Sequence, residues 1–449
     1  MYFLYSLLLI IWGFALLPVF LYKALRRGKR LPAMRQRFGR LPEHLRNDPQ
    51  DGRAVIWFHS CSVGETLSLE PLTRALRQRL PDARFLFSTV TQTGHEVAVR
   101  SFGAENVFYF PIDFAFVARR VLGRLRPCMI VIIDTEIWPN LLCQARLRGI
   151  PVALANGRIS PDSFRYYRLA RPALRRVFKN YTALMMQSEE DAQRIAAIGA
   201  PPEIISTPGN IKFDRGFSQF LQKDSREELR RDLDENFLGD INVDSASLIV
   251  AGSTHPGEER VLLEVLRELR RAPDLARTRL CLAPRHPERF DETADIAASA
   301  GFAMRRRARP EEENKSAPVL LLDTLGELAE IYRFADIVFV GGTLIRHGGH
   351  SILEPAAFSK AIVVGPSMEN FRAIRDEFVA RGALRQITAT CEDRSSQKKQ
   401  LLEIFRELLQ NAEARESLGR AAFAVIEKNR GAADKIADNL MRVYKGHTN

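Results

Sequence analysis

The sequence lacks the signatures of several common protein classes. It contains no G-x-x-x-x-G-K-[ST], H-E-x-x-H or G-x-S-x-G sequence, which argues against P-loop NTPases, zincins and α/β-hydrolases. No C-x-x-C pair is present, so neither a zinc site nor a disulfide framework is expected, and a reducing compartment is indicated. The five cysteines are odd in number and scattered, at Cys61, Cys128, Cys143, Cys281 and Cys391.

Collagen-like and low-complexity segments are also absent. The 449 residues are 46% hydrophobic and 27% charged, which is an ordinary globular composition. A chain of this length is expected to form two or three domains with sizeable cores.

Acidic residues are missing from one stretch, and charge of either sign is missing from another. Residues 1–22 carry no charged side chain, whereas residues 23–40 carry eight basic ones and no acid. Residues 158–180 carry seven basic residues against the single acid Asp162. The formal charge is +12, so outside these two clusters the chain is slightly acidic. This distribution argues against the nucleic-acid binding that the total charge suggests.

The uncharged segment 1–22 predicts a membrane-anchor helix, because about 20 apolar residues cross the hydrocarbon core. The basic juxtamembrane segment, residues 23–50, places the following domains on the cytoplasmic side. A cleaved signal peptide is the competing interpretation, but its positive charges would precede the apolar run, and no small-residue cleavage site follows.

The rest of the chain alternates short apolar runs with helical patterns, which predicts an α/β fold of parallel, doubly wound sheets. We expect one Rossmann-like domain at 51–212, a charged linker at 213–245, a second such domain at 246–430 and a C-terminal helix at 431–449. The segment Arg305–Ser316 is expected to be a polar loop. The predicted strands are Ala54–Phe58, Arg84–Ser88, Val107–Phe110, Met129–Ile133, Val152–Ala155, Ala183–Met186, Ser247–Ala251, Leu280–Ala283, Val319–Leu322, Ile337–Val340 and Ala361–Val364.

Polar residues follow the strands where ligands bind in such folds. After the first strand, HSCSVGE ends in Glu65, which falls in the first helical turn. Its carboxylate is a candidate general base, or else an acid that complements the helix dipole. Glu136, after the fourth strand, is expected to hold a substrate hydroxyl, to orient Glu65, or to pair with an arginine for structure. We interpret Cys61 beside His59 as a buried cysteine next to a structural histidine rather than a catalytic pair.

Basic residues follow the fifth strand. Asn156-Gly157-Arg158 leads into a helical stretch that carries Arg165 and Arg168. Arginine forks suit phosphate groups, so this stretch is either a solvated helix face or a site for anionic headgroups or phosphorylated lipid.

The second half has three comparable turns. Ser253-Thr254 ends a strand just before a helix, and Arg285-His286 ends the next; together they offer an anion site and a cation for phosphate. The third turn, Gly348-Gly349-His350-Ser351, has glycines that let a backbone approach a ligand. Glu354 lies four residues after His350, so the two are expected to share a helix face.

Taken together, these turns resemble the 3-deoxy-D-manno-octulosonic acid (Kdo) transferases of lipid A assembly. The resemblance covers nearly the whole chain. It rests on HSCSVGE, DTEIWPN, NGRIS, GNIKFD, GSTHPGEE, APRHPERF and HGGHSILEPA. It implies a GT-B fold, with two Rossmann-like domains facing a cleft, an acceptor-binding first domain and a CMP-Kdo-binding second one. It further implies an inverting transfer of Kdo from CMP-Kdo to a lipid A precursor (lipid IVA) at the cytoplasmic face of the inner membrane. No cofactor, essential metal or nucleic acid is implied.

The resemblance also implies roles for residues. Glu65 matches the catalytic base and Glu136 a second important acid. The sequence departs from the family pattern at Ser351-Ile352, where Asn-Pro is commoner, and at NGRIS, where N-A-R-x-S is commoner. Another membrane-anchored GT-B enzyme, with a different nucleotide sugar or acceptor, is the alternative. The implied donor-binding residues are Ser253, Thr254, Arg285, His286, Gly348, Gly349, His350, Ser351 and Glu354, and the expected acceptor-binding residues are Ser62, Gly64, Asn156, Arg158, Arg165 and Arg168.

Overall fold

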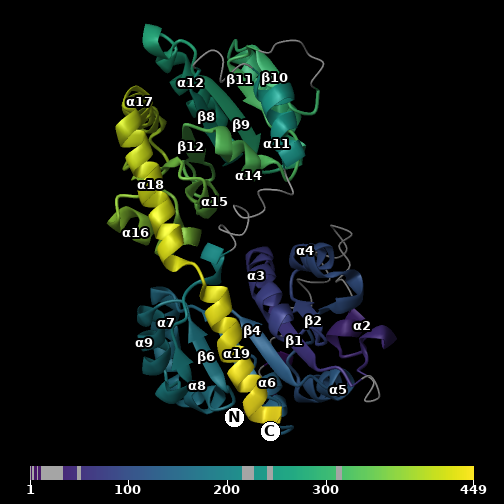
Figure 1. The fold of residues 1–449 in the computed structure, drawn as a ribbon. Helices are drawn as coiled ribbons and strands as arrows, with labels where there is room; N and C mark the ends of the chain where they lie inside the picture. The colour runs from purple at the N-terminus through teal and green to yellow at the C-terminus, as the bar shows by residue number, and fades with distance from the viewer. Residues whose placement is uncertain are drawn as a thin grey trace. The chain divides into compact units, whose positions relative to one another are not determined.

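The chain folds into two units, each built on a parallel sheet of seven strands (Figure 1). The computed structural model describes residues 2, 5–7, 9–11, 34–47, 52–214, 227–239, 246–309 and 316–448. Unit 1 comprises Met1–Arg215 and Gly431–Asn449, and unit 2 comprises Gly216–Arg430. The prediction of two doubly wound parallel α/β sheets is confirmed.

The sheet of unit 1 has the strand order β3-β2-β1-β4-β5-β6-β7. The central strands are mostly apolar because both faces of the sheet are covered, and every residue of β1 and β4 is buried. The strands are β1 (Val55–Ser60), β2 (Arg84–Thr89), β3 (Val107–Tyr109), β4 (Met129–Ile133), β5 (Val152–Gly157), β6 (Ala183–Met186) and β7 (Ile205–Ser206).

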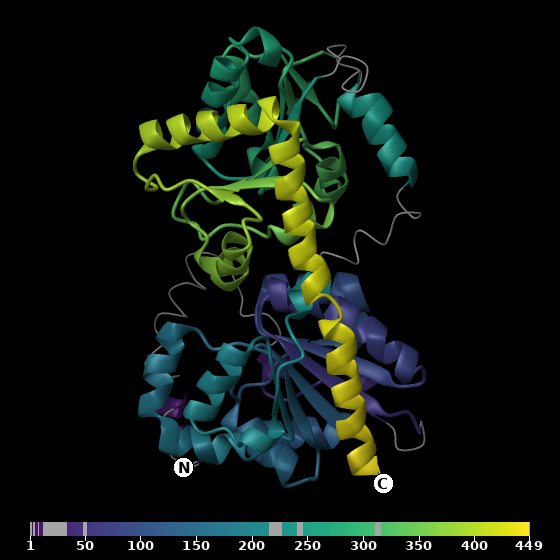
Figure 2. The same cartoon turned by 60° about the vertical axis from the view of Figure 1, so that its left-hand side comes forward.

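The helices of unit 1 lie on both faces of this sheet (Figure 2). The last of them, α19, returns from the far end of the sequence and packs beside α3, where Ile436 and Leu440 join the core that contains Leu69 and Leu72. The helices are α2 (Met34–Arg37), α3 (Val63–Arg79), α4 (Gln92–Phe102), α5 (Ala115–Leu125), α6 (Pro139–Arg146), α7 (Pro161–Leu169), α8 (Arg171–Phe178), α9 (Glu189–Ala197) and α19 (Ala432–Thr448).

The start of α19 is fixed by the motif GNIKFD. The carboxylate of Asp214 accepts hydrogen bonds from the backbone N–H groups of Gly431 (2.5 Å) and Ala433 (2.6 Å). A carboxylate at this end of a helix satisfies donors that have no partner within the helix and complements its dipole. Asp214 therefore attaches the returning chain to unit 1.

Unit 2 repeats the architecture with the strand order β10-β11-β9-β8-β12-β13-β14. Its strands are β8 (Leu248–Thr254), β9 (Arg279–Pro284), β10 (Met304–Arg306), β11 (Val319–Leu321), β12 (Ile337–Val340), β13 (Ala361–Val364) and β14 (Arg385–Gln386). Its helices are α11 (Glu227–Leu233), α12 (Glu258–Leu269), α13 (Phe290–Ser299), α14 (Leu328–Ile331), α15 (Leu353–Ala357), α16 (Arg372–Ala380), α17 (Arg394–Gln410) and α18 (Ala412–Asn429).

All eleven predicted strands form, with ends shifted by at most three residues. The prediction missed β7, β10 and β14, which are edge strands of two or three residues. The expectation of a polar loop from Arg305 was wrong at its start, because Arg305 and Arg306 lie in β10. Arg306 is neutralised there by Asp291 and Asp323, with N–O distances of 2.7 Å, so its charge does not prevent strand formation.

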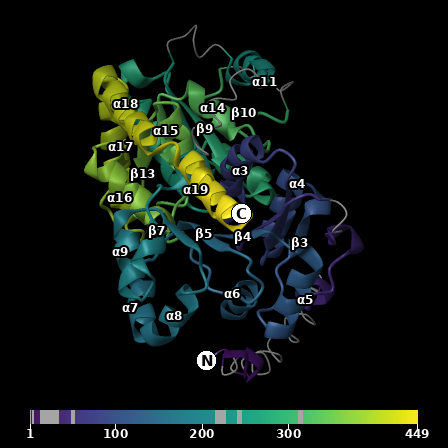
Figure 3. The same cartoon turned by 60° about the horizontal axis from the view of Figure 1, so that its bottom comes forward.

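The predicted anchor, residues 1–22, lies mostly outside the described residues, as does half of the basic segment, residues 23–50. The N-terminus lies near α6 (Figure 3). Three side chains there bond to other residues of unit 1: Tyr2 accepts a hydrogen bond from Asn180 (2.7 Å), Ser6 accepts one from Asn140 (3.0 Å), and Tyr5 is bonded to Asp113. Within the described part of the chain, no helix has the length and apolarity needed to cross a bilayer.

Candidate functional site

The topology of unit 1 brings the two candidate acids to one place. From β1 the sheet continues through β2 on one side and through β4 on the other, so the strand order reverses between β1 and β4. The crevice at such a switch point, outside the carboxyl ends of the strands, is where doubly wound sheets bind ligands. Glu65 follows β1 and Glu136 follows β4, so both flank this point.

The carboxylate of Glu65 is held by both of its oxygens. Ser62, the N-cap of α3, donates its hydroxyl to Oε1 at 2.7 Å, and the N–H of Cys61 donates to Oε2 at 2.6 Å. This arrangement resembles a capping box, so the helix-start interpretation describes part of what Glu65 does. Burial raises the pKa of Glu65, and the charge of Asp134 raises it further.

Glu136 lies in the same group of acids. Burial raises its pKa, Cys61 lowers it through a hydrogen bond, and the charges of Glu65 and Asp134 raise it. No arginine is among these influences, so the alternative in which Glu136 pairs with an arginine has no support in the described residues. Tyr181 fixes the backbone here by donating its hydroxyl to the Glu136 carbonyl oxygen at 2.9 Å.

Hydrogen bonds of the side-chain amides of Asn156 and Gln187 hold the turns that follow β4 and β5. Asp134 and Asn156 both adopt left-handed backbone conformations, with φ of 56° and 59°, and Asn156 donates its amide to Asp134 at 2.8 Å. Asn156 also accepts a hydrogen bond from the N–H of Ile211, and Gln187 donates to its carbonyl oxygen. Neither Asp134 nor Gln187 was among the site residues predicted from the sequence. Asn156 is buried, so its contribution is to hold the turn rather than to face solvent.

Cys61 and His59 lie close together without forming a reactive pair. The Sγ of Cys61 is 3.7 Å from Nε2 of His59, which is fully buried and stacks on Phe110 at 3.7 Å between ring centroids. Burial lowers the pKa of His59 to about 3, and burial with three nearby acids raises the pKa of Cys61 far above its usual range. A thiolate is the nucleophilic form of cysteine, so this environment suppresses its reactivity.

The basic stretch after β5 forms two helices. Arg158 bonds through its backbone to Thr135 (2.9 Å), whereas Arg165 and Arg168 project from α7 and are exposed. The neighbouring Tyr167 lies near Glu136, whose charge contributes to raising the tyrosine pKa after burial. Helix α7 therefore lies next to the cluster of acidic residues that includes Glu136. The structure shows no contact of Arg165 or Arg168 with Glu65 or Glu136.

Three further cations of this stretch, Arg171, Arg175 and Lys179, lie elsewhere, together with Arg146 at the end of α6. They line a cavity of about 630 Å³ beside the residues that precede β5, β6 and β7, at the opposite edge of the sheet from Glu65. Leu147 directly follows Arg146, and Leu169 lies two residues before Arg171. These two leucines are 73% and 84% exposed. The cationic lining consists of Arg146, Arg171, Arg175 and Lys179.

In unit 2 the strand order reverses between β8 and β12. Ser253, the residue before the last of β8, has a left-handed conformation (φ 57°), and the buried hydroxyl of Thr254 has no hydrogen-bond partner among the described residues. The carbonyl oxygen of Thr254 accepts a hydrogen bond from the N–H of Arg285 at 3.0 Å, and the side chains of Arg285 and His286 are exposed. A buried polar group without a partner calls for an explanation, and a bound ligand would supply one.

The loop after β12 requires its two adjacent glycines. Gly348 and Gly349 have φ of 94° and 76°, and a Cβ atom would lie 2.4 Å from Asn370 or 2.5 Å from Met368. The expectation that His350 and Glu354 share a helix face was wrong. Helix α15 begins only at Leu353, because Ser351 and its neighbours continue the loop, so His350 precedes the helix and Glu354 is its second residue.

Glu258, which the sequence analysis did not single out, joins the two loops that flank the switch point. Its buried carboxylate accepts hydrogen bonds from the N–H groups of His255 (2.9 Å), Gly342 (2.7 Å), Thr343 (2.9 Å) and Leu344 (2.9 Å). Burial raises its pKa to about 7, and the four donors act in the opposite direction. The sequence does show an acid at the first helical position after GSTHPG, which could have indicated a role for Glu258. Its burial depends on the tertiary structure and could not be predicted from the sequence.

The fold resembles those of two solved enzyme structures. UDP-GlcNAc 2-epimerase from Neisseria meningitidis aligns over 86% of this chain and 100% of its own at a TM-score of 0.56 and 14% identity. A glycosyltransferase from Rickettsia africae aligns over 88% of this chain and 99% of its own at a TM-score of 0.52 and 11% identity. Two doubly wound units of this kind make up a GT-B-like fold.

Sequence comparison gives the family. The family model described as 3-deoxy-D-manno-octulosonic-acid transferase (kdotransferase) matches residues 32–215. The 3-deoxy-D-manno-octulosonic acid transferase of Haemophilus influenzae is 34% identical over 87% of both chains, and that of Bordetella pertussis is 33% identical over 90% of both. The chain belongs to the Kdo transferase family and is a glycosyltransferase.

Proposed function

We propose that this enzyme transfers Kdo from CMP-Kdo to a lipid A precursor, lipid IVA, with inversion at the anomeric carbon. Unit 1 binds the acceptor and unit 2 binds the donor. The observation that carries the proposal is the placement of Glu65, with both oxygens fixed and its pKa raised, at the switch point of a Kdo transferase chain.

In this proposal Glu65 is the general base. It removes the proton from an acceptor hydroxyl as that oxygen forms a bond to the anomeric carbon of Kdo, and the bond from this carbon to the CMP phosphate oxygen breaks. One displacement from the face opposite the leaving group inverts the configuration. A raised pKa makes a carboxylate a better base near neutral pH. Glu136 and Asp134 contribute negative charge at this place, and Glu136 holds the acceptor hydroxyl or orients Glu65.

Unit 2 supplies the groups that would bind the CMP portion of the donor. The unpartnered hydroxyl of Thr254, the left-handed turn at Ser253 and the glycine backbone at Gly348 and Gly349 offer donors for phosphate and sugar oxygens. The exposed cations of Arg285 and His286 would stabilise the departing phosphate. His350, Ser351 and Glu354 complete the proposed donor set.

In unit 1, the proposed acceptor site consists of the acidic cluster Glu65, Asp134 and Glu136 and of basic residues near it. Ser62, Gly64, Asn156 and Arg158 form the turns around it, and Arg165 and Arg168 on α7 would bind phosphates of the lipid. The cationic cavity at the other sheet edge, with exposed Leu147 and Leu169 beside it, supports docking on an anionic membrane surface. We place the enzyme at the cytoplasmic face of the inner membrane, with residues 1–22 as its anchor.

Mass spectrometry of the product tests donor and acceptor together. Incubation with CMP-Kdo and lipid IVA is expected to add the mass of one or more Kdo residues. Addition from a UDP-sugar in the same assay, with none from CMP-Kdo, would instead favour a GT-B enzyme with another donor. Deleting residues 1–22 should reduce membrane association while retaining transfer to detergent-dispersed acceptor.

A further inference from the structure

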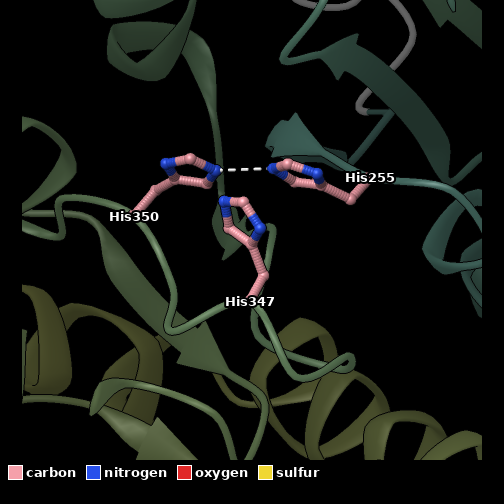
Figure 4. Close-up of side chains that lie close together, drawn as sticks. All are labelled: His255, His347 and His350. Atoms are coloured by element: carbon pink, nitrogen blue, oxygen red, sulfur yellow. Dashed lines mark hydrogen bonds between the residues drawn. The ribbon is translucent and has the colours of Figure 1, made fainter. Parts of the chain in front are cut away.

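Four of the eight histidines of the chain lie at the carboxyl edge of the unit 2 sheet, and three of them converge. His255 follows β8, while His347 and His350 lie in the loop between β12 and α15. One ring nitrogen from each lies within 4.8 Å of the other two, and the Nε2 atoms of His255 and His350 are 2.9 Å apart. Figure 4 shows the three imidazoles turned toward one shared space.

Two of the rings, those of His255 and His350, lie among cations and other imidazoles in the described part of the chain. Burial and neighbouring cations lower the pKa of His255 to about 4 and that of His350 to about 3, and no carboxylate is among the charges that act on either ring. A neutral imidazole ring has one nitrogen lone pair, which is the form of histidine that binds metal ions.

From this geometry we propose that His255, His347 and His350 form a binding site for one divalent transition-metal ion of the Zn²⁺ class. Imidazole nitrogens suit Zn²⁺, Cu²⁺ and Ni²⁺, whereas Mg²⁺ and Ca²⁺ require oxygen ligands. Three protein ligands leave one position of a tetrahedral zinc ion open, and the exposed side of His347 places that position toward solvent. Zn–N bonds of about 2.0–2.1 Å require the two Nε2 atoms to separate by a few tenths of an ångström.

The loops that carry the ligands are fixed before any ion binds. Glu258 accepts hydrogen bonds from the N–H of His255 and from three N–H groups at the start of the β12 loop. The other end of that loop is bound by Asn370, which donates to the carbonyl oxygen of His347 at 3.0 Å, and by Ser367, which accepts from the N–H of Gly348 at 2.9 Å. Such support lowers the cost of bringing ligands together.

Binding of a metal ion at this site does not imply that sugar transfer requires a metal. His350 also belongs to the proposed donor set, so an ion held by this residue should compete with CMP. This consequence rests on the proposed function, whereas binding of the ion itself does not. The two therefore fail separately: zinc binding without competition would count against the donor role of His350 alone.

Titration calorimetry of the untagged chain with ZnCl₂, after dialysis against a chelator, tests the site. We expect one ion per chain, a rise in Tm with zinc, and at least a tenfold weaker affinity in His347→Ala and His347→Gln. His347 is exposed, so these variants should fold, and Tm without zinc verifies it. His44→Ala, which removes a lone exposed histidine of unit 1, should bind zinc as the parent does. Absence of stoichiometric binding, or full affinity in both His347 variants, would overturn the proposal.

Discussion

The hydroxyl of Ser62 donates a hydrogen bond to Oε1 of Glu65 at 2.7 Å, while the N–H of Glu65 points back to the same hydroxyl at 3.4 Å. This reciprocal pair caps α3 and at the same time fixes a carboxylate at the switch point of unit 1. One arrangement therefore satisfies both interpretations of Glu65, and variants are needed to separate them.

Glu65→Gln should reduce transfer by about 10²–10⁴-fold, because an amide cannot accept the acceptor proton. Ser62→Ala removes the cap, at about 1 kcal/mol of stability, but leaves the carboxylate in place, so its transfer rate should fall far less. Initial rates with CMP-Kdo and lipid IVA measure both variants, with thermal unfolding and CMP binding as controls. Equal losses of rate in the two variants would show that Glu65 acts only as a cap.

The rate should depend on pH through Glu65. The base acts when deprotonated, so transfer should rise with pH through a pKa above the ordinary glutamate value of 4.5. Asp134→Asn removes a negative charge that raises this pKa, and asparagine tolerates the left-handed backbone at this position. The acid limb of kcat/KM should consequently move to lower pH in this variant. If the acid limb of kcat/KM does not move in Asp134→Asn, the charge of Asp134 does not influence the pKa of Glu65.

Cys61→Ala should keep transfer within about threefold of the parent rate, since side chains outside the transition state change rates little. The N–H that binds Glu65 belongs to the backbone and survives the substitution. Slow alkylation of Cys61 in the folded parent, compared with the same thiol in denaturant, would match its raised pKa. If Cys61→Ala lost transfer while keeping normal stability, a catalytic cysteine–histidine pair of Cys61 and His59 would be supported instead.

Charge reversal by Arg168→Glu with Arg175→Glu should raise the KM for lipid acceptor by at least about tenfold, because each basic residue near an anionic surface contributes about 1 kcal/mol. CMP binds to unit 2 in the proposed function, so its affinity should not change. Arg74→Glu, an exposed arginine on α3, is the matched control. A parallel loss of CMP affinity would contradict a role confined to the acceptor.

Glu258→Gln should destabilise unit 2 by about 2–3 kcal/mol and weaken CMP binding, because its amide NH₂ would face backbone donors that now bind a carboxylate. Denaturant unfolding and CMP titration measure the two effects. Glu264→Gln, an exposed acid on the same helix, should change neither. Unchanged stability in Glu258→Gln would mean that this carboxylate does not hold the two loops.

Sequence patterns predicted the central strands because their apolar runs are continuous, and they located Glu65 and Ser253 because strand ends are marked by glycine and polar residues. They missed β10, where arginines were taken for loop residues before their acidic partners were known. They also failed at His350, since spacing of four residues indicates a shared face only where a helix exists. The buried contacts of Glu258 and the convergence of three histidines depend on tertiary packing, which local patterns do not contain.

The return of α19 to unit 1, attached by Asp214, has a consequence for synthesis on the ribosome. Nascent domains generally fold in order from the N-terminus, yet the apolar surface of unit 1 that receives Ile436 and Leu440 stays uncovered until α19 emerges. All of unit 2 is translated in the interval. The first unit to be started is thus the last to be completed, and a chain that stopped at Arg430 would contain all of unit 2 but would leave unit 1 without α19.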